Sequence, residues 1–412
     1  MNRELADVLA VAANVAVAIP VAVVFVETVA ALWPERRREY AAAASPARVA
    51  VLVPAHNEET AIQATLRDIR SQLAIGDRII VVADNCSDDT AALARQGGAE
   101  VLERRDEVRR GKGFALAHGL EHLKAQPPDL VVFVDADTHV AAGSIAALRG
   151  RVMESAGPVQ AVYLLDIPAD AGPTAGISAF AFLVKNLVRP VGGARLGIPC
   201  QLLGTGMAMP WGVIDIQRLA TGNIVEDMQL GVDLAIRGRP PRLCLEARVT
   251  GSLPAGRQAA LIQRTRWEHG HLGTLLTQVP RLTWHGLSRL RPSLLGMALD
   301  LAVPPLALLC MIWLLVAGAS SVLAWRGLSG IPAWIAACTG ASIGLTVLLA
   351  WARHARGVIP GRVLAFAPFY ALWKIPLYVA FIFRRQKDWV RTPREHPSGT
   401  MPRQKPPGPE GS

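Results

Sequence analysis

The chain has 412 residues, of which 51% are hydrophobic, and it carries a formal net charge of +10. This length suffices for one large catalytic domain and a membrane part. The basic residues are dispersed without a DNA- or RNA-binding motif, so we expect no nucleic-acid partner and favour anionic lipid headgroups and a pyrophosphate. The five cysteines form no CxxC pair, which argues against a disulfide framework and against a zinc site.

Residues 1–35 are predicted to form a transmembrane anchor. Residues 5–33 carry almost no charge and exceed the roughly 20 residues that cross about 30 Å of hydrocarbon. They lack the basic start, short apolar core and cleavage site of a secretory signal. Arg36, Arg37 and Arg38 follow at once, and the positive-inside rule places them in the cytoplasm. We therefore expect a multi-pass protein of the cell (inner) membrane with a cytoplasmic catalytic domain.

Residues 46–290 are predicted to form an α/β domain. The apolar runs 49–53, 78–83 and 130–134 are typical of buried strands, and helix-start signals follow them. Such alternation predicts a mostly parallel sheet that binds ligands at the carboxyl ends of its strands. Polar residues at those ends are therefore the candidate site.

Asp84 closes the second of these strands, and its carboxylate can accept the imide proton of a uracil ring. A turn or helix-capping acid is the structural alternative. The end of the neighbouring strand could hold the base and ribose from the other side. Its residues are Pro54, Ala55, His56, Asn57 and Glu58.

Asp135 and Asp137 follow the third strand, where both carboxylates can face one cleft. Mg²⁺ takes one or two carboxylates together with substrate phosphates, so this pair predicts a metal site that neutralises a departing diphosphate. Lys112 opens a helix after a glycine and is the candidate diphosphate contact. An exposed basic loop is the alternative for Lys112.

Glu226 and Asp227 begin a later helix, and Asp227 is the candidate base that takes the proton from an attacking hydroxyl. A helix-capping acid pair is the alternative. Gln263, Arg266 and Trp267 share one face of a further helix. Arg266 can pair with a phosphate and Trp267 can offer a flat wall to a sugar ring, although an interfacial anchor would have the same composition.

Residues 294–385 are predicted to return to the membrane in three apolar stretches, at 294–325, 331–352 and 363–383. The last contains Lys374, which is costly in lipid, so this stretch either spans, lies at the interface or re-enters. We expect the basic residues that follow it to be cytoplasmic. The tail at 396–412 is rich in Pro, Gly and Ser and is predicted to be disordered.

Residues 46–285 resemble the family-2 glycosyltransferases, in particular the membrane synthases of cellulose, hyaluronan, chitin and poly-N-acetylglucosamine. The motifs that carry the resemblance are the stretches 54–58, 82–85, 135–137, 225–227 and 263–267. The resemblance implies a GT-A-type fold, a UDP-sugar donor with Asp84 on the uracil, and Mg²⁺ or Mn²⁺ on Asp135 and Asp137. It also implies that Asp227 is the base, that Gly204 and Thr205 border the acceptor, and that residues 389–394 form a gating element.

The expected function is therefore inverting transfer of a sugar from a nucleotide sugar to a growing polysaccharide of the cell envelope. Transfer of one sugar to a lipid or lipid-linked acceptor is the alternative, and a membrane component that senses nucleotides without turnover is a third. Two departures from the family matter. Ala83 stands where the family often has a second acid, and the few membrane segments imply that processive export would need a homo-oligomer or an export partner.

Overall fold

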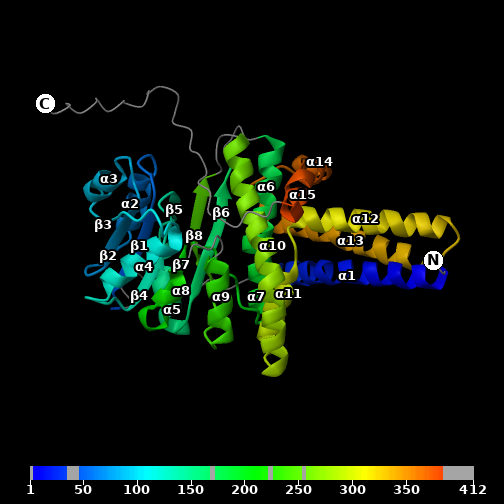
Figure 1. The fold of residues 1–412 in the computed structure, drawn as a ribbon, viewed down its shortest axis with the longest axis horizontal. Helices are drawn as coiled ribbons and strands as arrows, with labels where there is room; N and C mark the ends of the chain where they lie inside the picture. The colour runs from blue at the N-terminus through cyan, green and yellow to red at the C-terminus, as the bar shows by residue number, and fades with distance from the viewer. Residues whose placement is uncertain (1–2, 35–45, 168–171, 221–225, 253–256, 384–412) are drawn as a thin grey trace.

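The computed structural model describes residues 3–34, 46–167, 172–220, 226–252 and 257–383. An α/β domain forms one end of an elongated molecule, and long helices project from the other end (Figure 1). Several expectations concern residues outside the described ones. These are the basic groups at 36–38 and 384–387, the motif residue 225, the motif at 389–394 and the tail from 396.

The α/β domain is built on an eight-stranded sheet with the order β3-β2-β1-β4-β7-β6-β8-β5. The strands are β1 (Val49–Ala55), β2 (Arg78–Asp84), β3 (Glu100–Arg104), β4 (Leu130–Phe133), β5 (Thr138–Val140), β6 (Val159–Asp166), β7 (Met207–Pro210) and β8 (Arg242–Ser252). The strands predicted at 49–53, 78–83 and 130–134 are confirmed as β1, β2 and β4.

The sheet is mixed, whereas the sequence predicted a mostly parallel one. Strands β3, β2, β1 and β4 run parallel, but β7 is antiparallel to β4 and to β6, and β5 is antiparallel to β8. Parallel pairing needs a crossover of a dozen or more residues, whereas β5 follows β4 after a turn of only a few. The chain therefore reverses just after the DxD motif.

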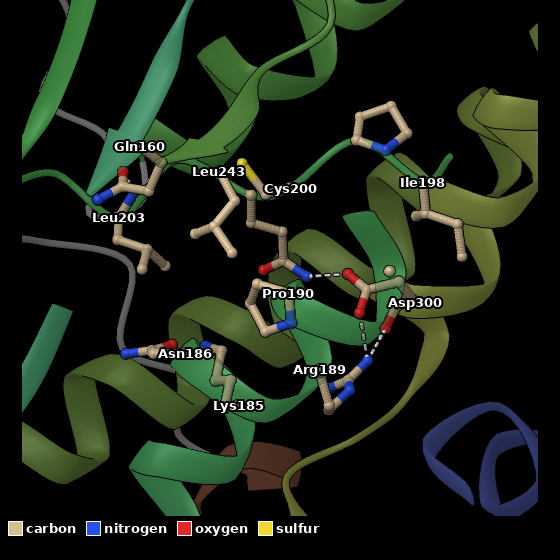
Figure 2. A pocket seen from close by; sticks show the side chains of 13 residues that line it. Gln160, Lys185, Asn186, Arg189, Pro190, Ile198, Cys200, Leu203, Leu243 and Asp300 are labelled. Atoms are coloured by element: carbon tan, nitrogen blue, oxygen red, sulfur yellow. Dashed lines mark hydrogen bonds and ion pairs between the residues drawn. The ribbon is translucent and has the colours of Figure 1, made fainter. Parts of the chain in front are cut away.

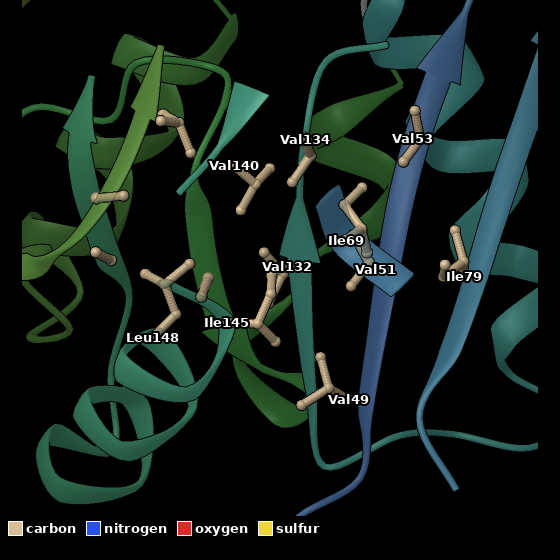
Figure 3. Packing of buried hydrophobic residues seen from close by; sticks show 14 of the residues in the cluster. Val49, Val51, Val53, Ile69, Ile79, Val132, Val134, Val140, Ile145 and Leu148 are labelled. Atoms are coloured by element: carbon tan, nitrogen blue, oxygen red, sulfur yellow. The ribbon is translucent and has the colours of Figure 1, made fainter. Parts of the chain in front are cut away.

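Helices cover both faces of the sheet because side chains alternate along each strand. Val51 and Val53 of β1 pack with Ile69 of α2 (Ile62–Arg70) and Ile145 of α5 (Ser144–Ser155), as Figure 3 shows. Leu52 faces the opposite layer, which contains Leu116 and Leu120 of α4 (Lys112–Leu123) and residues of α9 (Glu226–Ile236). The smaller helices are α3 (Thr90–Gln96) and α8 (Ile216–Leu219).

A layer of helices separates the sheet from the long helices. It contains α6 (Pro173–Leu183), a π-helical turn at Val184–Val188, α7 (Arg189–Arg195) and α10 (Arg257–Ser288). Helix α10 runs along the boundary between the two parts (Figure 1) and contacts α9 on one side and α11 (Pro292–Ala302) on the other. This layer places polar helices beside the apolar bundle.

Helices α1 (Arg3–Ala30), α12 (Leu306–Trp325) and α13 (Ile331–Ala350) lie side by side (Figure 1) and pack against one another. By length and composition, four segments could cross a membrane. They are Arg3–Ala30, Leu306–Trp325, Ile331–Ala355 and Gly361–Phe381. Large apolar side chains on the bundle's outer face are exposed, which suits contact with lipid.

The predicted stretch 294–325 is not one helix. It divides into α11 and α12 at Val303, Pro304 and Pro305, because proline lacks a backbone N–H and restricts the residue before it. The stretch 363–383 is also divided, into a 3₁₀ turn (Gly361–Phe366), α14 (Ala367–Trp373) and α15 (Ile375–Phe383). Whether this last segment spans or re-enters stays a prediction.

Lys374 lies at the break between α14 and α15. Its Nζ contacts Glu268 Oε1 of α10 and lies 4.6 Å from the centre of the Tyr370 ring. A paired lysine that faces the catalytic side explains how the cation is accommodated in an apolar segment.

Candidate active site

A cavity of about 280 Å³ lies between the sheet domain, α10 and the long helices. Polar residues from strand ends and helix starts line one part of it, and residues of the apolar helices line another. The lining includes Val24, Lys112, Asp135, Tyr163, Phe182, Lys185, Asn186, Gly204, Glu226, Asp227, Arg264, Arg266, Trp267, Glu268, His271, Pro305, Leu306 and Ala307. Asp135 follows β4 and Gly204 precedes the antiparallel β7, so both reach the same sheet edge.

Lys112 is held at this edge by two acceptors. Its Nζ contacts Asp135 Oδ1 and donates a hydrogen bond of 2.9 Å to the carbonyl oxygen of Gly204. Loss of hydration lowers the pKa of Lys112, but the charges of Asp135 and Glu226 outweigh it, so the pKa is raised. The cation is therefore retained beside the carboxylate, as a diphosphate contact requires.

Asp135 and Asp137 fit a divalent cation. Loss of hydration and the charge of Asp135 raise the pKa of Asp137 to about 6, although its side chain keeps contact with solvent. Two carboxylates that repel one another are stabilised by a cation between them. No three His, Cys, Asp or Glu side chains cluster as a metal site within the part of the chain that the structure describes, so donor phosphates and water would complete the ligand set.

Thr205 lies beneath the cavity and does not line it. Its side chain is fully buried, and its Oγ1 accepts a hydrogen bond of 3.1 Å from the backbone N–H of Asp135. The same hydroxyl is 3.2 Å from Thr138 Oγ1. Thr205 therefore positions the DxD turn, which differs from the acceptor contact that the resemblance implied.

Glu226 and Asp227 both line the cavity at the start of α9. Burial and the charge of Asp227 raise the pKa of Glu226 to about 7. Burial also raises the pKa of Asp227, while the Lys112 charge and the backbone N–H of Met228, which donates to Asp227 Oδ1 at 2.8 Å, act in the opposite direction. Asp227 thus keeps two stabilising partners when ionised, which suits a general base.

Helix α10 presents Arg264, Trp267, Glu268 and His271 to the cavity, with a spacing of three or four residues, and Arg266 also lines it. Gln263 is not among the lining residues, so the cavity face of the helix differs from the predicted Gln263, Arg266 and Trp267 face. The difference arises because spacing along a helix shows which residues share a face, whereas tertiary packing decides which face meets the cavity.

An aromatic wall closes one side of the cavity. The ring centres of Trp267 and Phe182 are 5.4 Å apart, and the Phe182 ring is 5.2 Å from Tyr163 in an edge-to-face arrangement. The sequence predicts Trp267 as a flat wall for a sugar. Tyr163 and Phe182 precede Trp267 by 104 and 85 positions and belong to no motif, so the sequence does not predict them.

Asp84 lies outside the cavity lining, and it is paired. Arg104 Nη1 donates to Asp84 Oδ1 at 2.5 Å, and Arg104 Nη2 is 3.1 Å from Asp106 Oδ2. The sequence analysis missed Arg104, yet it is the register partner of Asp84 across β2 and β3, and a strand alignment could have found it. The carboxylate that the sequence predicts to bind the base is therefore part of an ion pair.

The end of β1 is tied to the loop after β2. Asn57 has φ +56° and exchanges hydrogen bonds with Ser87, through its Nδ2 to Ser87 Oγ at 3.0 Å and its Oδ1 from Ser87 N–H at 2.7 Å. The Glu58 N–H donates to Thr90 Oγ1 at 2.7 Å. Pro54 and Ala55 continue the parallel pairing with β2. None of these residues lines the cavity described above, and Asn57 has a structural role in shaping this turn.

Lys185, Asn186 and Arg189 are functional candidates that the sequence analysis missed. They lie on the π-helical turn and the start of α7, and all three line the cavity. A usable signal was present, because two cations four residues apart interrupt an otherwise apolar stretch.

A family model described as "Glycosyltransferase like family 2" matches residues 46–270. Among curated relatives, glucosyl-3-phosphoglycerate synthase of Mycobacterium tuberculosis is 38% identical over 106 residues, which cover 24% of this chain and 32% of that protein. Glycosyltransferase AglD of Haloferax volcanii is 32% identical over 112 residues, which cover 25% of this chain and 18% of that protein. The chain thus spans a third or less of the length of these relatives.

Among solved structures, the mannosyltransferase PcManGT from Pyrobaculum calidifontis, in complex with GDP-Man and Mn²⁺, superposes with a TM-score of 0.54. It is 16% identical, and the match covers 93% of this chain and 100% of that one. At this identity the likeness shows the fold alone, which is a GT-A-like α/β fold with a curled mixed sheet. Because the family model matches more than half of its residues, the chain belongs to the glycosyltransferase-like family 2.

Proposed function

We propose that the chain is a membrane-bound, inverting glycosyltransferase that moves a sugar from a nucleoside-diphosphate sugar to a lipid or lipid-linked acceptor. One observation carries the proposal: a single cavity is lined by Lys112, Asp135 and Asp227 and also by Val24 and Leu306 of the apolar helices. A site that needed only soluble substrates would not require a wall of membrane helix. The catalytic domain would lie on the cytoplasmic face, where nucleotide sugars are made.

The donor would occupy the sheet side of the cavity. Asp84, oriented by Arg104, would bind the base, and Lys112 would contact the diphosphate. Asp135 and Asp137 would hold Mg²⁺ or Mn²⁺, which supplies positive charge to the leaving diphosphate. Support comes from the structurally similar mannosyltransferase PcManGT, whose structure is a complex with GDP-Man and Mn²⁺. Whether the nucleotide is UDP or GDP is decided by the base-binding turn.

In the reaction, the acceptor hydroxyl oxygen forms a bond to the anomeric carbon while that carbon's bond to the diphosphate oxygen breaks. Asp227 takes the hydroxyl proton, and the electron pair leaves with the nucleoside diphosphate. Lys112 remains beside the leaving group and offsets its charge. Attack from the face opposite the leaving group inverts the anomeric configuration. The aromatic wall of Trp267, Phe182 and Tyr163 would hold the sugar ring.

Polysaccharide synthesis is the second candidate. Arg266 and Trp267, which belong to the motif shared with the polysaccharide synthases, line the cavity as that function requires. Product length separates the two functions, because a polymer gives a ladder or smear on a gel and single transfer gives one added sugar.

The proposed activity can be tested with the full chain purified in a neutral detergent. It would be incubated with Mn²⁺ or Mg²⁺, a panel of nucleotide sugars and a total lipid extract, and both nucleotide release and label in the lipid phase would be measured. We expect metal-dependent release with label in lipid, and loss of both in Asp227→Asn with nucleotide binding kept. If Asp227→Asn transfers sugar at the normal rate, Asp227 is not the base. If no donor gives nucleotide release, the proposal that the chain is an enzyme is wrong.

A further inference from the structure

Lys185 is an enclosed cation that touches no carboxylate of the described residues. It lines the cavity from the π-helical turn, and within the described part of the chain its ammonium group makes no hydrogen bond or ion pair. Three of the other cations that line the cavity do contact carboxylates: Lys112 contacts Asp135, Arg189 contacts Glu27 and Asp300, and Lys374 contacts Glu268. An unpaired charge in a partly dry site is costly, so its retention points to an anion that arrives with a ligand.

Two buried polar groups beside Lys185 also lack partners. Asn186 and His271 are each 3% exposed and line the same cavity. Within the described chain, Asn186 Oδ1 and His271 Nδ1 have no hydrogen-bond partner. His271 Nε2 lies 3.0 Å from the carbonyl oxygen of Val303, so Nε2 carries the proton and Nδ1 offers a lone pair to a hydroxyl. Figure 2 shows Lys185 next to Asn186, while dashed contacts join Arg189 to Asp300.

Lys185 and Lys112 serve different parts of the cavity. After loss of hydration, the charges that act on the pKa of Lys112 are Asp135, Glu226 and Asp227, all in the sheet domain or α9. Those that act on the pKa of Lys185 are Arg189, Asp227, Asp300 and Glu268, and the pKa is lowered because burial and Arg189 prevail. Asp227 is the acid common to both lysines. The charged surroundings of Lys185 thus include Asp227 together with Glu268 of α10 and Asp300 of α11.

The same cavity continues to apolar groups of the membrane helices. Val24 of α1 and Pro305, Leu306 and Ala307 at the start of α12 line it. An anion that binds Lys185 thus has an apolar surface beside it. A free inorganic anion would leave this surface uncovered, whereas an anion that carries an acyl or isoprenoid chain would cover it. The cavity thus combines a carboxylate, an enclosed cation and hydrocarbon groups in one lining.

We propose that Lys185, with Asn186 and His271, binds the anionic headgroup of the lipid acceptor, a phosphate ester, while its hydrocarbon chain lies against α1 and the start of α12. The phosphate accepts from Lys185 Nζ, and a hydroxyl of the headgroup donates to His271 Nδ1. This inference rests on the proposed transfer to a lipid acceptor and names the chemical class of that acceptor.

The test measures binding by isothermal titration to the full chain in dodecyl maltoside. The probes are dodecyl phosphate, dodecanol and inorganic phosphate. The variants are Lys185→Met and Lys185→Arg. Lys124→Met is the matched control, because Lys124 is exposed and paired with Glu121. Binding of UDP and GDP with Mn²⁺ is measured on the same samples. The nucleotide measurement reports on the donor site independently of the lipid.

Dodecyl phosphate should bind the unaltered chain at least about ten-fold more tightly than dodecanol or inorganic phosphate, because a charge-assisted hydrogen bond and the chain both contribute. Lys185→Met should lose about ten-fold or more of that affinity, Lys185→Arg should keep most of it, and Lys124→Met should match the unaltered chain. Nucleotide binding should be the same in all of them.

Three results would overturn the inference. If dodecanol binds as tightly as dodecyl phosphate, the site does not recognise an anion. If inorganic phosphate binds equally tightly, the hydrocarbon chain does not contribute to binding. If Lys185→Met keeps the affinity for dodecyl phosphate, Lys185 does not bind the phosphate. The comparison of the three probes needs no variant, so it holds even where Lys185→Met does not fold. Failure to bind any nucleotide would instead count against the proposed function and leave the lipid measurement to decide the role of Lys185.

Discussion

Gly204 shows how tightly the catalytic residues are packed around one backbone position. It has φ +81°, a conformation that L side chains rarely adopt, and an added Cβ would be 3.0 Å from Asp227 Oδ2 and 3.1 Å from Lys112 Nζ. Its carbonyl oxygen also accepts the Lys112 hydrogen bond. Backbone strain and crowding therefore coincide at Gly204, next to Asp227, the proposed base, and Lys112, the proposed diphosphate contact.

Gly204→Ala should therefore lower the turnover number by about ten-fold or more, because the methyl group displaces Asp227 and Lys112 from each other. Gly212→Ala is the matched control, since a Cβ there meets nothing within 4 Å. Steady-state kinetics and the melting temperature of both variants would be measured. Equal turnover of the two variants would show that the glycine is not needed for catalysis.

The acid pair at the start of α9 predicts a pH dependence. The proton on Asp227 must be absent for it to act as base, and its pKa is raised by burial, so activity should fall as the pH drops, starting at a higher pH than for a free aspartate. Glu226, whose pKa is about 7, adds negative charge beside it. Glu226→Gln removes that charge and should move the acidic limb of kcat/KM to lower pH. Identical acidic limbs in the variant and the unaltered chain would exclude the coupling.

Between elements, the contact of α1 with α7 is the closest that the structure describes at the domain boundary. An added Cβ at Gly192 would overlap the carbonyl group of Glu27, because the two backbones touch there. Next to it, Glu27 accepts a 2.8 Å hydrogen bond from Arg189 Nε, and Arg189 Nη2 donates to Asp300 Oδ1 at 2.6 Å. A buried charge network and a glycine contact therefore hold α1 against the α/β domain.

Gly192→Ala should separate α1 from α7 and destabilise the protein by about 1–3 kcal/mol, the usual effect of overpacking. Gly193→Ala is a control from the same helix, because its nearest contact would be Ile198 Cβ at an ordinary 3.5 Å. Thermal unfolding in detergent would compare the two variants. A melting temperature of Gly192→Ala that equals that of Gly193→Ala would contradict the close contact.

At the scale of the whole molecule, the catalytic domain and the long helices share one site. The sequence was sufficient to predict strands β2 and β4, which lead to Asp84 and Asp135, because apolar runs followed by polar turns are local signals. It was not sufficient for the antiparallel β7, for Arg104 or for Lys185, since their roles depend on partners far along the chain. Local patterns predicted residue types, and packing decided which of them face the cavity.

The four candidate spans predict that the protein behaves as an integral membrane protein. Alkaline carbonate washing of membranes that contain the full chain should leave it in the pellet, because the exposed apolar side chains on the outer faces of the bundle suit contact with lipid. A peripheral protein bound through its basic residues would be released by the same wash or by high salt. Recovery of the chain in the supernatant would contradict the membrane assignment.

The proline break at Pro304 and Pro305 makes α12 begin in the wall of the cavity. An acceptor that diffuses laterally in one leaflet can therefore reach Asp227 without desorbing into water. Its search is two-dimensional and its effective concentration is a surface density, so the rate of transfer should follow the mole fraction of acceptor in the bilayer and not its amount per volume of solution.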